Sequence, residues 1–221
     1  MYLITDYIED PDIERSILGE PVLEKCKYQA RVLLVWHERI DESYLAKFDK
    51  LQGVVRYGVG YDNIDLETLS ERRIVFCNTP DYGIGEVSDT AVGMILNISR
   101  GISLYDRKSR SLTGQRWQEE RISSLNRNSD QIIGIIGAGR IGGSVCQKLK
   151  SIGFEVVFYD PYVCSGHEKM LDVGRVRSLP ELLAISDQVS IHTPLTRETR
   201  AMVNDDFVSL MKKGSGLVNT A

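Results

Sequence analysis

The stretch at residues 131–142, with the sequence QIIGIIGAGRIG, constrains the fold of this chain more than any other. It begins with apolar, mostly β-branched residues, which are typical of a strand buried on both faces. It ends in the pattern G-x-G-x-x-G, after which a helix is expected. In this pattern Gly137 allows a tight turn, Gly139 lets the backbone approach a pyrophosphate, and Gly142 lets the helix pack close to the strand. The helix N-terminus then offers unpaired N–H groups to phosphates.

Asp160 strengthens this interpretation, because it follows the next predicted strand at residues 155–159. It lies 18 residues after Gly142 (160 − 142 = 18), close to the spacing of about 20 residues expected for an acid that binds the adenine ribose. A carboxylate there accepts hydrogen bonds from ribose hydroxyls and repels a 2′-phosphate, so the sequence favours NAD over NADP. The alternative is that Asp160 is only a turn residue before Pro161. The strand–loop–helix–strand context favours the cofactor role.

The composition excludes several other classes of protein. The 221 residues are enough to bury a core, and are long for one domain and short for two. A net charge of −4 argues against a nucleic-acid-binding surface, and no apolar run approaches the roughly 20 residues that span a bilayer. The N-terminus lacks the pattern of a signal peptide, so we expect a cytoplasmic protein. The four cysteines are scattered and interpreted as free thiols, and no metal site is expected from the ligand spacing.

Strands and helices alternate along the chain, which predicts parallel sheets with helices on both faces. Strands are expected at residues 2–5, 31–36, 53–57 and 74–77, and then from residue 131 and at 155–159, 174–176, 188–191 and 216–219. One long helix is expected at residues 86–108, and Trp117 should anchor the polar segment that follows. We place the domain boundary near Gly101, so that the two domains span residues 1–100 and 101–221.

Seven segments carry a more specific signal, because they occur together and in this order. They are residues 58–65 (GVGYDNID), 77–80 (CNTP), 86–89 (EVSD), 137–142 (GAGRIG), 159–161 (YDP), 186–196 (SDQVSIHTPLT) and 217–221 (LVNTA). Together they resemble the NAD-dependent D-2-hydroxyacid dehydrogenase family. The resemblance implies two doubly wound parallel-sheet domains, a flavodoxin-like substrate domain and a Rossmann NAD-binding domain, with the cofactor in the cleft between them. It also implies an oxidoreductase that transfers hydride between NAD(H) and C2 of a 2-hydroxy or 2-oxo acid.

By position, the resemblance implies roles for two groups of residues. Val59 and Gly60 would offer backbone N–H groups to the substrate carboxylate. In the cofactor site, Arg140 and Ile141 would lie at the pyrophosphate, together with the three glycines of the loop, and Asp160 would lie at the ribose. The remaining cofactor contacts would be Val87, His192, Thr193, Pro194, Thr199, Thr220 and Ala221.

The catalytic residues of this family would all follow Ala221. An Arg comes directly after the Asn-Thr-Ala segment in the family, and the Glu and His of its acid–base pair come later. Ketone reduction needs a tuned proton donor and a cation where negative charge develops. We therefore expect a Rossmann domain truncated after its fifth strand, a substrate domain without its return segment, and a chain that is inactive by itself. The alternative is a catalytically dead NAD-binding regulatory or interaction protein.

Four further residues could be functional, but most have simpler interpretations. His192 could donate a proton only if it reached the substrate, and its position favours packing beside the cofactor. His37 is expected to have a loop or structural role, and His167 to be solvated. Arg56 could face the cleft or form an ion pair at a strand end. The apolar helix around residues 87–98 and the segment around Trp117 resemble the dimer region of the family, so we expect a homodimer.

Overall fold

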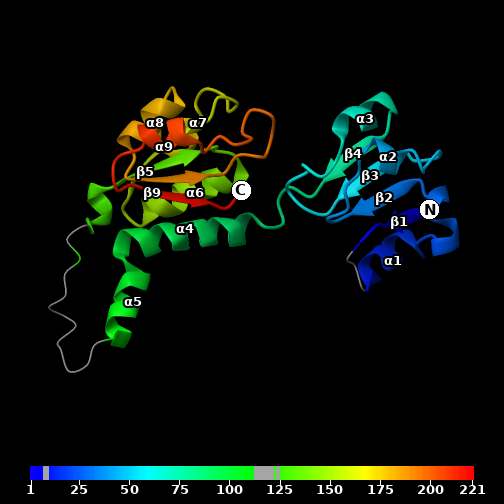
Figure 1. Ribbon diagram of the computed structural model, residues 1–221, viewed down its shortest axis with the longest axis horizontal. Helices are drawn as coiled ribbons and strands as arrows, with labels where there is room; N and C mark the ends of the chain where they lie inside the picture. Colours follow the sequence, from blue (N-terminus) through cyan, green and yellow to red (C-terminus); the bar gives the residue numbers. More distant parts are fainter. Residues whose placement is uncertain (7–9, 112–121, 123–124) are drawn as a thin grey trace. The chain divides into compact units, whose positions relative to one another are not determined.

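The computed structural model describes residues 1–6, 10–111, 122 and 125–221, so Trp117 lies outside the described residues. The chain forms two compact units, Met1–Gly83 and Ile84–Ala221 (Figure 1). Each unit holds one sheet in which all described strand pairs are parallel. The predicted α/β class with two parallel sheets is therefore confirmed.

The first unit is built on a four-stranded sheet in the order β1-β2-β3-β4. Its strands are β1 (Tyr2–Ile4), β2 (Val32–Val35), β3 (Gly53–Arg56) and β4 (Val75–Asn78), and its helices are α1 (Asp12–Leu18), the 3₁₀ helix η1 (Glu24–Gln29), α2 (Glu42–Leu45) and α3 (Leu66–Glu71). Asp41 and Asp65 cap α2 and α3, since their side chains accept hydrogen bonds from the N–H groups of Tyr44 and Thr68. The core of this unit includes Leu33, Val35, Leu45, Phe48, Val54 and Leu69.

The strand order of the first unit differs in one respect from a complete flavodoxin-like sheet. That fold has the order 2-1-3-4-5. If its second strand is left out and the others are renumbered, the order becomes 1-2-3-4, which is the order observed. Between β1 and β2, the described residues supply α1 and η1 but no strand. Three charged residues, Glu24, Lys25 and Lys27, interrupt the apolar residues that a buried strand would need there.

The second unit contains a five-stranded sheet in the order β7-β6-β5-β8-β9. Its strands are β5 (Ile132–Ile136), β6 (Glu155–Tyr159), β7 (Gly174–Arg175), β8 (Gln188–Ile191) and β9 (Gly216–Asn219). Counted along the chain, this order is 3-2-1-4-5, which matches the first five positions of the Rossmann order 3-2-1-4-5-6. The predicted Rossmann topology is confirmed, with β5 at the centre of the sheet.

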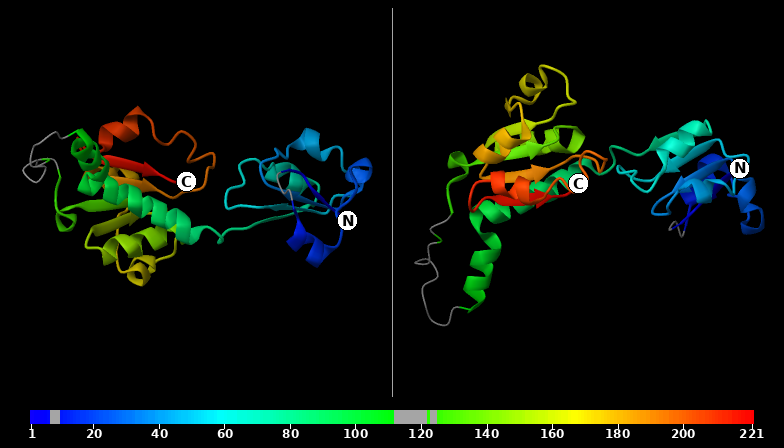
Figure 2. Two further views of the ribbon diagram at one scale, coloured as in Figure 1. Left: turned by 90° about the horizontal axis from the view of Figure 1, so that it is seen from below. Right: turned by 45° about the horizontal axis from the view of Figure 1, so that its top comes forward.

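Helices cover both faces of the second sheet (Figure 2). On one face α4 (Ile84–Arg100) and α6 (Arg140–Ser151) pack over Ile133 and Ile135. On the other face α8 (Leu179–Ile185) and α9 (Asp205–Leu210) pack around Ile136 and Val189. The remaining helices are α5 (Ile102–Ser111), the 3₁₀ helix η3 (Asn128–Asp130) and α7 (His167–Leu171). None of the helices in the described part of the chain is long and apolar enough to cross a membrane.

Helix α4 packs with the second sheet. The boundary between the two units along the chain therefore lies between Gly83 and Ile84, and not near the expected position at residues 100 and 101. The cause is the apolar stripe of this helix. Ala91 and Ile95 are fully buried in the same core as the strands of the second sheet. An amphipathic helix belongs to the sheet against which it buries its apolar stripe.

The single helix expected at residues 86–108 is divided into α4 and α5 at Gly101. This residue has a φ of 61°, outside the helical region, and a side chain there would lie 2.8 Å from Leu125 Cδ1. Apolar residues continue beyond the break at Ile102 and Leu104. The periodic pattern therefore could not reveal the interruption.

In the first unit, Asp6 joins the carboxyl ends of β1 and β2. Its carboxylate accepts hydrogen bonds from the backbone N–H groups of Trp36, His37 and Glu38 at 3.0, 2.6 and 3.1 Å. The hydroxyl of Thr5 donates a further hydrogen bond at 2.6 Å. Burial raises the pKa of the Asp6 carboxyl, but the hydrogen bonds outweigh burial and lower the pKa below its ordinary value.

We expect Asp6→Ala to destabilise the first unit by about 1–3 kcal/mol, because three N–H groups lose their acceptor. The stabilisation should be complete above the pKa of an unfolded Asp, about 3.9, and should be lost as the pH falls from there through the lower folded pKa. Amide hydrogen exchange in β1 and β2 measures the effect, with exposed Asp49→Ala as the control. Equal exchange rates in both variants would show that other contacts hold the loop at residues 36–38.

Candidate functional site

The turn after β5 is the centre of the candidate site in the second unit. β5 ends at Ile136, and α6 begins at Arg140. Gly137 has a φ of 87°, which residues with side chains rarely adopt. A Cβ at Gly137 would lie 2.8 Å from the carbonyl oxygen of His192, and a Cβ at Gly142 would lie 1.9 Å from the carbonyl oxygen of Gly137. These two glycines therefore permit the tight turn and the close helix packing that the sequence predicts.

Gly139 differs from the other two glycines because it faces open space. Apart from Gly139 and its two chain neighbours, no heavy atom of the described residues lies within 4 Å of a Cβ built there, and the residue is exposed. Gly139 is also the N-cap of α6, and no side chain caps the helix at this position. The first N–H groups of α6, around Arg140 and Ile141, are therefore available to an anion, which the helix dipole also favours. This geometry suits a pyrophosphate.

Asp160 lies beside this loop, directly after β6. Its Oδ2 accepts a hydrogen bond from the N–H of Ala138 at 2.9 Å, and its Oδ1 accepts one from the N–H of Tyr162 at 2.8 Å. The bond to Tyr162 is the turn contact expected of an Asp before Pro161. The bond to Ala138 spans 22 residues and places the carboxylate against the glycine-rich loop. A carboxylate has about four acceptor positions, so both oxygens can still accept hydrogen bonds from a ligand.

Two residues that the sequence did not single out for this site support the loop and Asp160. Nε2 of His167 lies 2.8 Å from the carbonyl oxygen of Ala138, and it must carry the proton because a carbonyl only accepts. The expectation that His167 is solvated is therefore wrong. Arg175 donates a hydrogen bond to the carbonyl oxygen of Asp160 at 2.7 Å. Both residues follow Asp160 in a segment without a clear periodic pattern, so neither contact could be predicted from the sequence.

His192 lies at the carboxyl end of β8, beside the glycine-rich loop. Its Nε2 is 2.9 Å from Ser190 Oγ, and its Nδ1 is 3.5 Å from Thr220 Oγ1. Burial lowers the pKa of His192 to about 4. The imidazole is therefore neutral at pH 7 and is not tuned to exchange protons there. This environment favours the packing role over the role of a substitute acid.

Four of the residues implied for the cofactor line one pocket of about 260 Å³ at the same edge of the sheet. They are Thr193, Pro194, Thr199 and Ala221. The loop between β8 and α9 is closed by its own hydrogen bonds, since Thr199 Oγ1 donates to the carbonyl oxygen of Pro194 at 2.6 Å. The structure thus brings residues from the ends of β8 and β9 into one concave surface.

Three of the implied site residues come from other elements. Val87 lies on α4 next to Ser88, whose Oγ accepts hydrogen bonds from Ser144 and Lys148 of α6 at 3.1 and 2.6 Å. Val59 and Gly60 lie in the loop after β3 of the first unit. The carbonyl oxygen of Val59 accepts a hydrogen bond from Asn78 Nδ2 at 2.9 Å, while Gly60 is exposed.

Arg56 ends β3, immediately before that loop. Its Cζ lies 5.5 Å from the centre of the Trp36 ring, a cation–π contact. Gly58 makes room for the guanidinium, since a Cβ at this glycine would lie 1.2 Å from Arg56 Nη1. Nε of Arg56 is buried and has no hydrogen-bond partner within the described part of the chain. A cation with an unsatisfied donor therefore lies at the carboxyl end of the first sheet.

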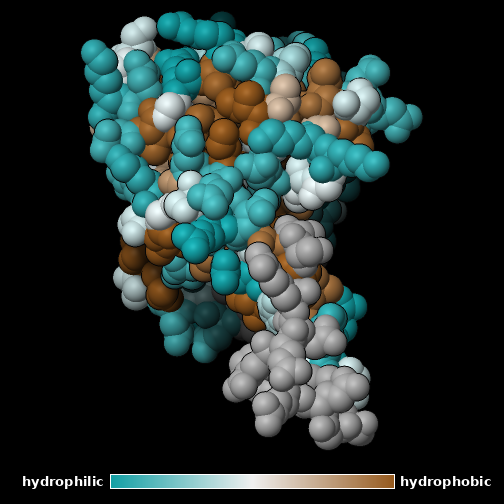
Figure 3. Space-filling view, turned by 90° about the vertical axis from the view of Figure 1, so that its left-hand side faces the viewer, coloured by the Kyte–Doolittle hydropathy of each residue, from teal (hydrophilic) through white to brown (hydrophobic). Residues whose placement is uncertain are grey.

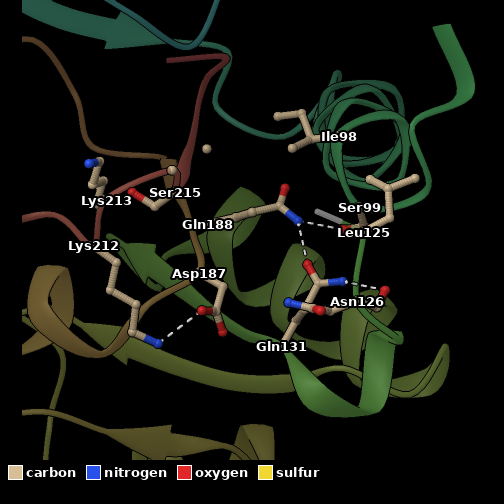
Figure 4. Close-up of a pocket in the computed structure, with 12 residues that line it drawn as sticks. Ile98, Ser99, Leu125, Asn126, Gln131, Asp187, Gln188, Lys212, Lys213 and Ser215 are labelled. Atoms are coloured by element: carbon tan, nitrogen blue, oxygen red, sulfur yellow. Dashed lines mark hydrogen bonds and ion pairs between the residues drawn. The ribbon is translucent and has the colours of Figure 1, made fainter. Parts of the chain in front are cut away.

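A second pocket in this unit, of about 280 Å³, lies at the opposite edge of the sheet (Figure 4). It is lined by Gln131, before β5, and by Asp187 and Gln188 at the start of β8. Gln188 Nε2 donates to Gln131 Oε1 at 3.0 Å, and Lys212 Nζ donates to Asp187 at 2.9 Å. Open α/β sheets bind ligands at the carboxyl ends of their strands. This pocket at the amino ends is therefore not the expected cofactor site, despite its size.

Two further observations concern metal-ligating side chains and the thiol of Cys146 on α6. The residues that the structure describes contain no group of three or more His, Cys, Asp or Glu side chains that could hold a metal ion. Cys146 lies on α6 and is fully buried, and burial raises the pKa of its thiol to about 12. A thiol with this pKa stays protonated and inert at neutral pH.

Comparison with known proteins agrees with this geometry. The family model "D-isomer specific 2-hydroxyacid dehydrogenase, NAD binding domain" matches residues 92–221. The chain is 31% identical to C-terminal-binding protein 1 of Caenorhabditis elegans over 207 residues, covering 91% of this chain and 28% of that protein. It is also 31% identical to D-3-phosphoglycerate dehydrogenase of Methanocaldococcus jannaschii over 219 residues, covering 99% and 41% of the two chains. The chain thus spans less than half the length of these relatives.

A solved structure extends the comparison to the whole fold. D-lactate dehydrogenase of Aquifex aeolicus, determined with NAD and lactic acid, superposes with a TM-score of 0.85 at 27% identity. The match covers all of this chain and 68% of that one. Both units are therefore folded as in a protein that binds NAD.

The two glycines with different surroundings should respond differently to the same substitution. Gly139→Ala should fold normally but bind NAD more weakly, because the new methyl group occupies the open space needed by the pyrophosphate. Gly142→Ala should destabilise the second unit by about 1–3 kcal/mol, because its Cβ meets backbone. Thermal unfolding and titration calorimetry with NAD measure the two effects. If Gly139→Ala retained full affinity for NAD, the pyrophosphate would not lie on this loop.

Proposed function

The chain belongs to the D-isomer specific 2-hydroxyacid dehydrogenase family, and on this premise we propose an NAD-dependent oxidoreductase function for it. In this proposal the nucleotide lies at the carboxyl edge of the second sheet. Hydride passes between the nicotinamide and C2 of a 2-hydroxy or 2-oxo acid.

The observation that carries the proposal is the contact between Asp160 and the glycine-rich loop. The open space at Gly139 and the uncapped start of α6 suit the pyrophosphate. The Asp160 carboxylate lies 2.9 Å from the N–H of Ala138, one residue before that space. A nucleotide with its pyrophosphate on the loop would therefore have its adenine ribose beside this carboxylate. The pocket at Thr193, Pro194 and Thr199 would receive the adenosine side.

The substrate side of the proposal rests on the loop after β3. Val59 and Gly60 would offer N–H groups to the substrate carboxylate, as the family resemblance implies. Arg56, with its unsatisfied Nε, adds a positive charge beside this loop. A cation next to these N–H groups favours an anionic ligand, such as the carboxylate of a 2-oxo acid.

The role of Asp160 is tested by the choice between the two nicotinamide cofactors. The unaltered protein should bind NAD more tightly than NADP, because the carboxylate repels a 2′-phosphate. Asp160→Ala should narrow this preference by about tenfold or more, since removal of one charge-assisted contact costs about 1.5–3 kcal/mol. Calorimetry with both nucleotides measures the ratio, and Asp130→Ala, which removes an exposed carboxyl, is the control. Tighter binding of NADP by the unaltered protein would overturn the assignment.

The alternative function is an NAD-binding regulatory or interaction protein, in which no histidine at the site needs to donate a proton. His192, the histidine at the glycine-rich loop, is neutral and buried, and His167 is committed to the carbonyl of Ala138. NADH oxidation with pyruvate, glyoxylate, hydroxypyruvate and 2-oxoglutarate distinguishes the two functions. Turnover above a control without protein favours the enzyme. Because the catalytic Arg, Glu and His of the family would follow Ala221, the alternative is favoured only if the full-length gene product lacks them.

We also propose that the protein forms a homodimer through α4 and α5. Apolar side chains of these helices reach the surface, including Met94 at 44% and Ile102 at 54% exposure. Figure 3 faces the end of the second unit where α4 passes into α5, and it shows apolar side chains between the polar ones. Two copies that bury these side chains against each other would remove them from water.

Light scattering should then give about twice the chain mass of 24.9 kDa, that is 2 × 24.9 = 49.8 kDa. Ile102→Glu should shift the protein toward the monomer, because it places a charge in the apolar contact. Val208→Glu is the matched control, since Val208 is 56% exposed on α9. A monomeric mass for the unaltered protein would contradict the proposal.

A further inference from the structure

We propose that Arg175 is a positioning residue for the cofactor site, which holds the loop after β6 so that the Asp160 carboxylate faces the ribose position. The inference rests on the proposed function, because the ribose contact of Asp160 is itself proposed. Arg175 would touch neither the nucleotide nor the reacting atoms. It would act on the backbone that carries Asp160.

The guanidinium of Arg175 binds three backbone carbonyls of one loop. Nη2 donates to the carbonyl oxygens of Asp160 and Val163 at 2.7 and 3.1 Å, and Nη1 donates to that of Cys164 at 3.2 Å. The carbonyls belong to a turn of five residues, from 160 to 164, so one side chain fixes both of its ends. The planar, five-donor fork of an arginine suits such a set, because its donors have fixed directions.

The position of this guanidinium is set by its own neighbours. Arg175 is paired with Phe158 across β6 and β7, and its Cζ lies 5.7 Å from the centre of the Phe158 ring. Nη1 lies 3.8 Å from Glu168 Oε2 on α7, and the Arg175 side chain is only 19% exposed. A charged side chain that is buried to this extent is held by its partners and does not sample solvent freely. The guanidinium therefore has a fixed position, and its hydrogen bonds hold the loop at residues 160–164 in place.

The hydrogen bonds continue from Arg175 to the glycine-rich loop. The carbonyl of Asp160 accepts a hydrogen bond from Arg175. The carboxylate of Asp160 accepts hydrogen bonds from the N–H groups of Ala138 and Tyr162. The carbonyl of Ala138 in turn accepts a hydrogen bond from His167 Nε2. The N–H and the carbonyl of Ala138 are thus both hydrogen-bonded, and so are the carboxylate and the carbonyl of Asp160. The carboxylate and the pyrophosphate loop keep one relative position as long as the chain of contacts is complete.

Loss of the arginine fork should therefore affect cofactor choice more than overall binding. Without Arg175, the carbonyls at 160, 163 and 164 lose their common donor and the turn can relax toward water. A displaced Asp160 carboxylate would repel a 2′-phosphate less, so the affinity for NADP would rise relative to the affinity for NAD. A residue that only stabilised the fold would weaken the binding of both nucleotides by the same factor. The ratio of the two dissociation constants separates these roles.

The experiment measures the dissociation constants of NAD and NADP by calorimetry in four proteins. These are the unaltered chain, Arg175→Met, Arg175→Lys and Arg177→Met. Met keeps an unbranched stem over Phe158 but has no donor, while Lys keeps the charge without the fork. Arg177, which is exposed two residues further on, is the matched control.

We expect Arg175→Met to reduce the preference for NAD by about tenfold, the factor that corresponds to about 1.4 kcal/mol. Arg175→Lys should reduce it less, and Arg177→Met should leave it unchanged. If Arg175→Met does not fold, the Lys variant decides the test by the same ratio. An unchanged ratio in a folded Arg175 variant, while Asp160→Ala still narrows the preference, would overturn this inference alone. If the unaltered protein showed no preference for NAD, the proposed function would fail, and this inference with it.

Discussion

The close approach of helix α6 to the turn after β5 is the contact on which the second unit depends. A Cβ at Gly142 would lie 1.9 Å from the carbonyl oxygen of Gly137, so the helix can start where it does only because residue 142 has no side chain. This approach directs the uncapped N–H groups of α6 to the carboxyl edge of the sheet. The residues after β6 and β8 reach the same edge because the strands are parallel. One steric constraint thus places uncapped N–H groups beside the loops that follow β6 and β8.

The second sheet and its loop could be predicted from the sequence because their signals are local. The apolar run before Gly137, the three glycines and the acid at Asp160 lie within about 30 residues and follow a known order of strands. The three glycines also differ in their surroundings, since Gly137 and Gly142 approach backbone whereas Gly139 faces open space. The family resemblance supplied the pocket residues Thr193 and Thr199, which no periodic pattern would have indicated.

Other features could not be predicted, for distinct physical reasons. The break at Gly101 leaves the apolar periodicity intact, so it is visible only in the backbone angle. The assignment of α4 to the second sheet depends on which core buries Ala91 and Ile95, and a helix pattern does not say which sheet it faces. The contacts of His167 and Arg175 join side chains to carbonyls 29 and 15 residues away. Single-residue chemistry carries no information about such partners until the fold is known.

We propose that the carboxyl edge of the second sheet binds NAD through the loop at residues 137–142 and Asp160. A crystal structure of the protein with NAD tests it most directly. We expect pyrophosphate oxygens at the N–H groups of Arg140 and Ile141, and ribose hydroxyls within about 2.5–3.0 Å of the Asp160 carboxylate. NAD bound elsewhere, for example in the pocket at Gln188, or a ribose that does not contact Asp160, would contradict it.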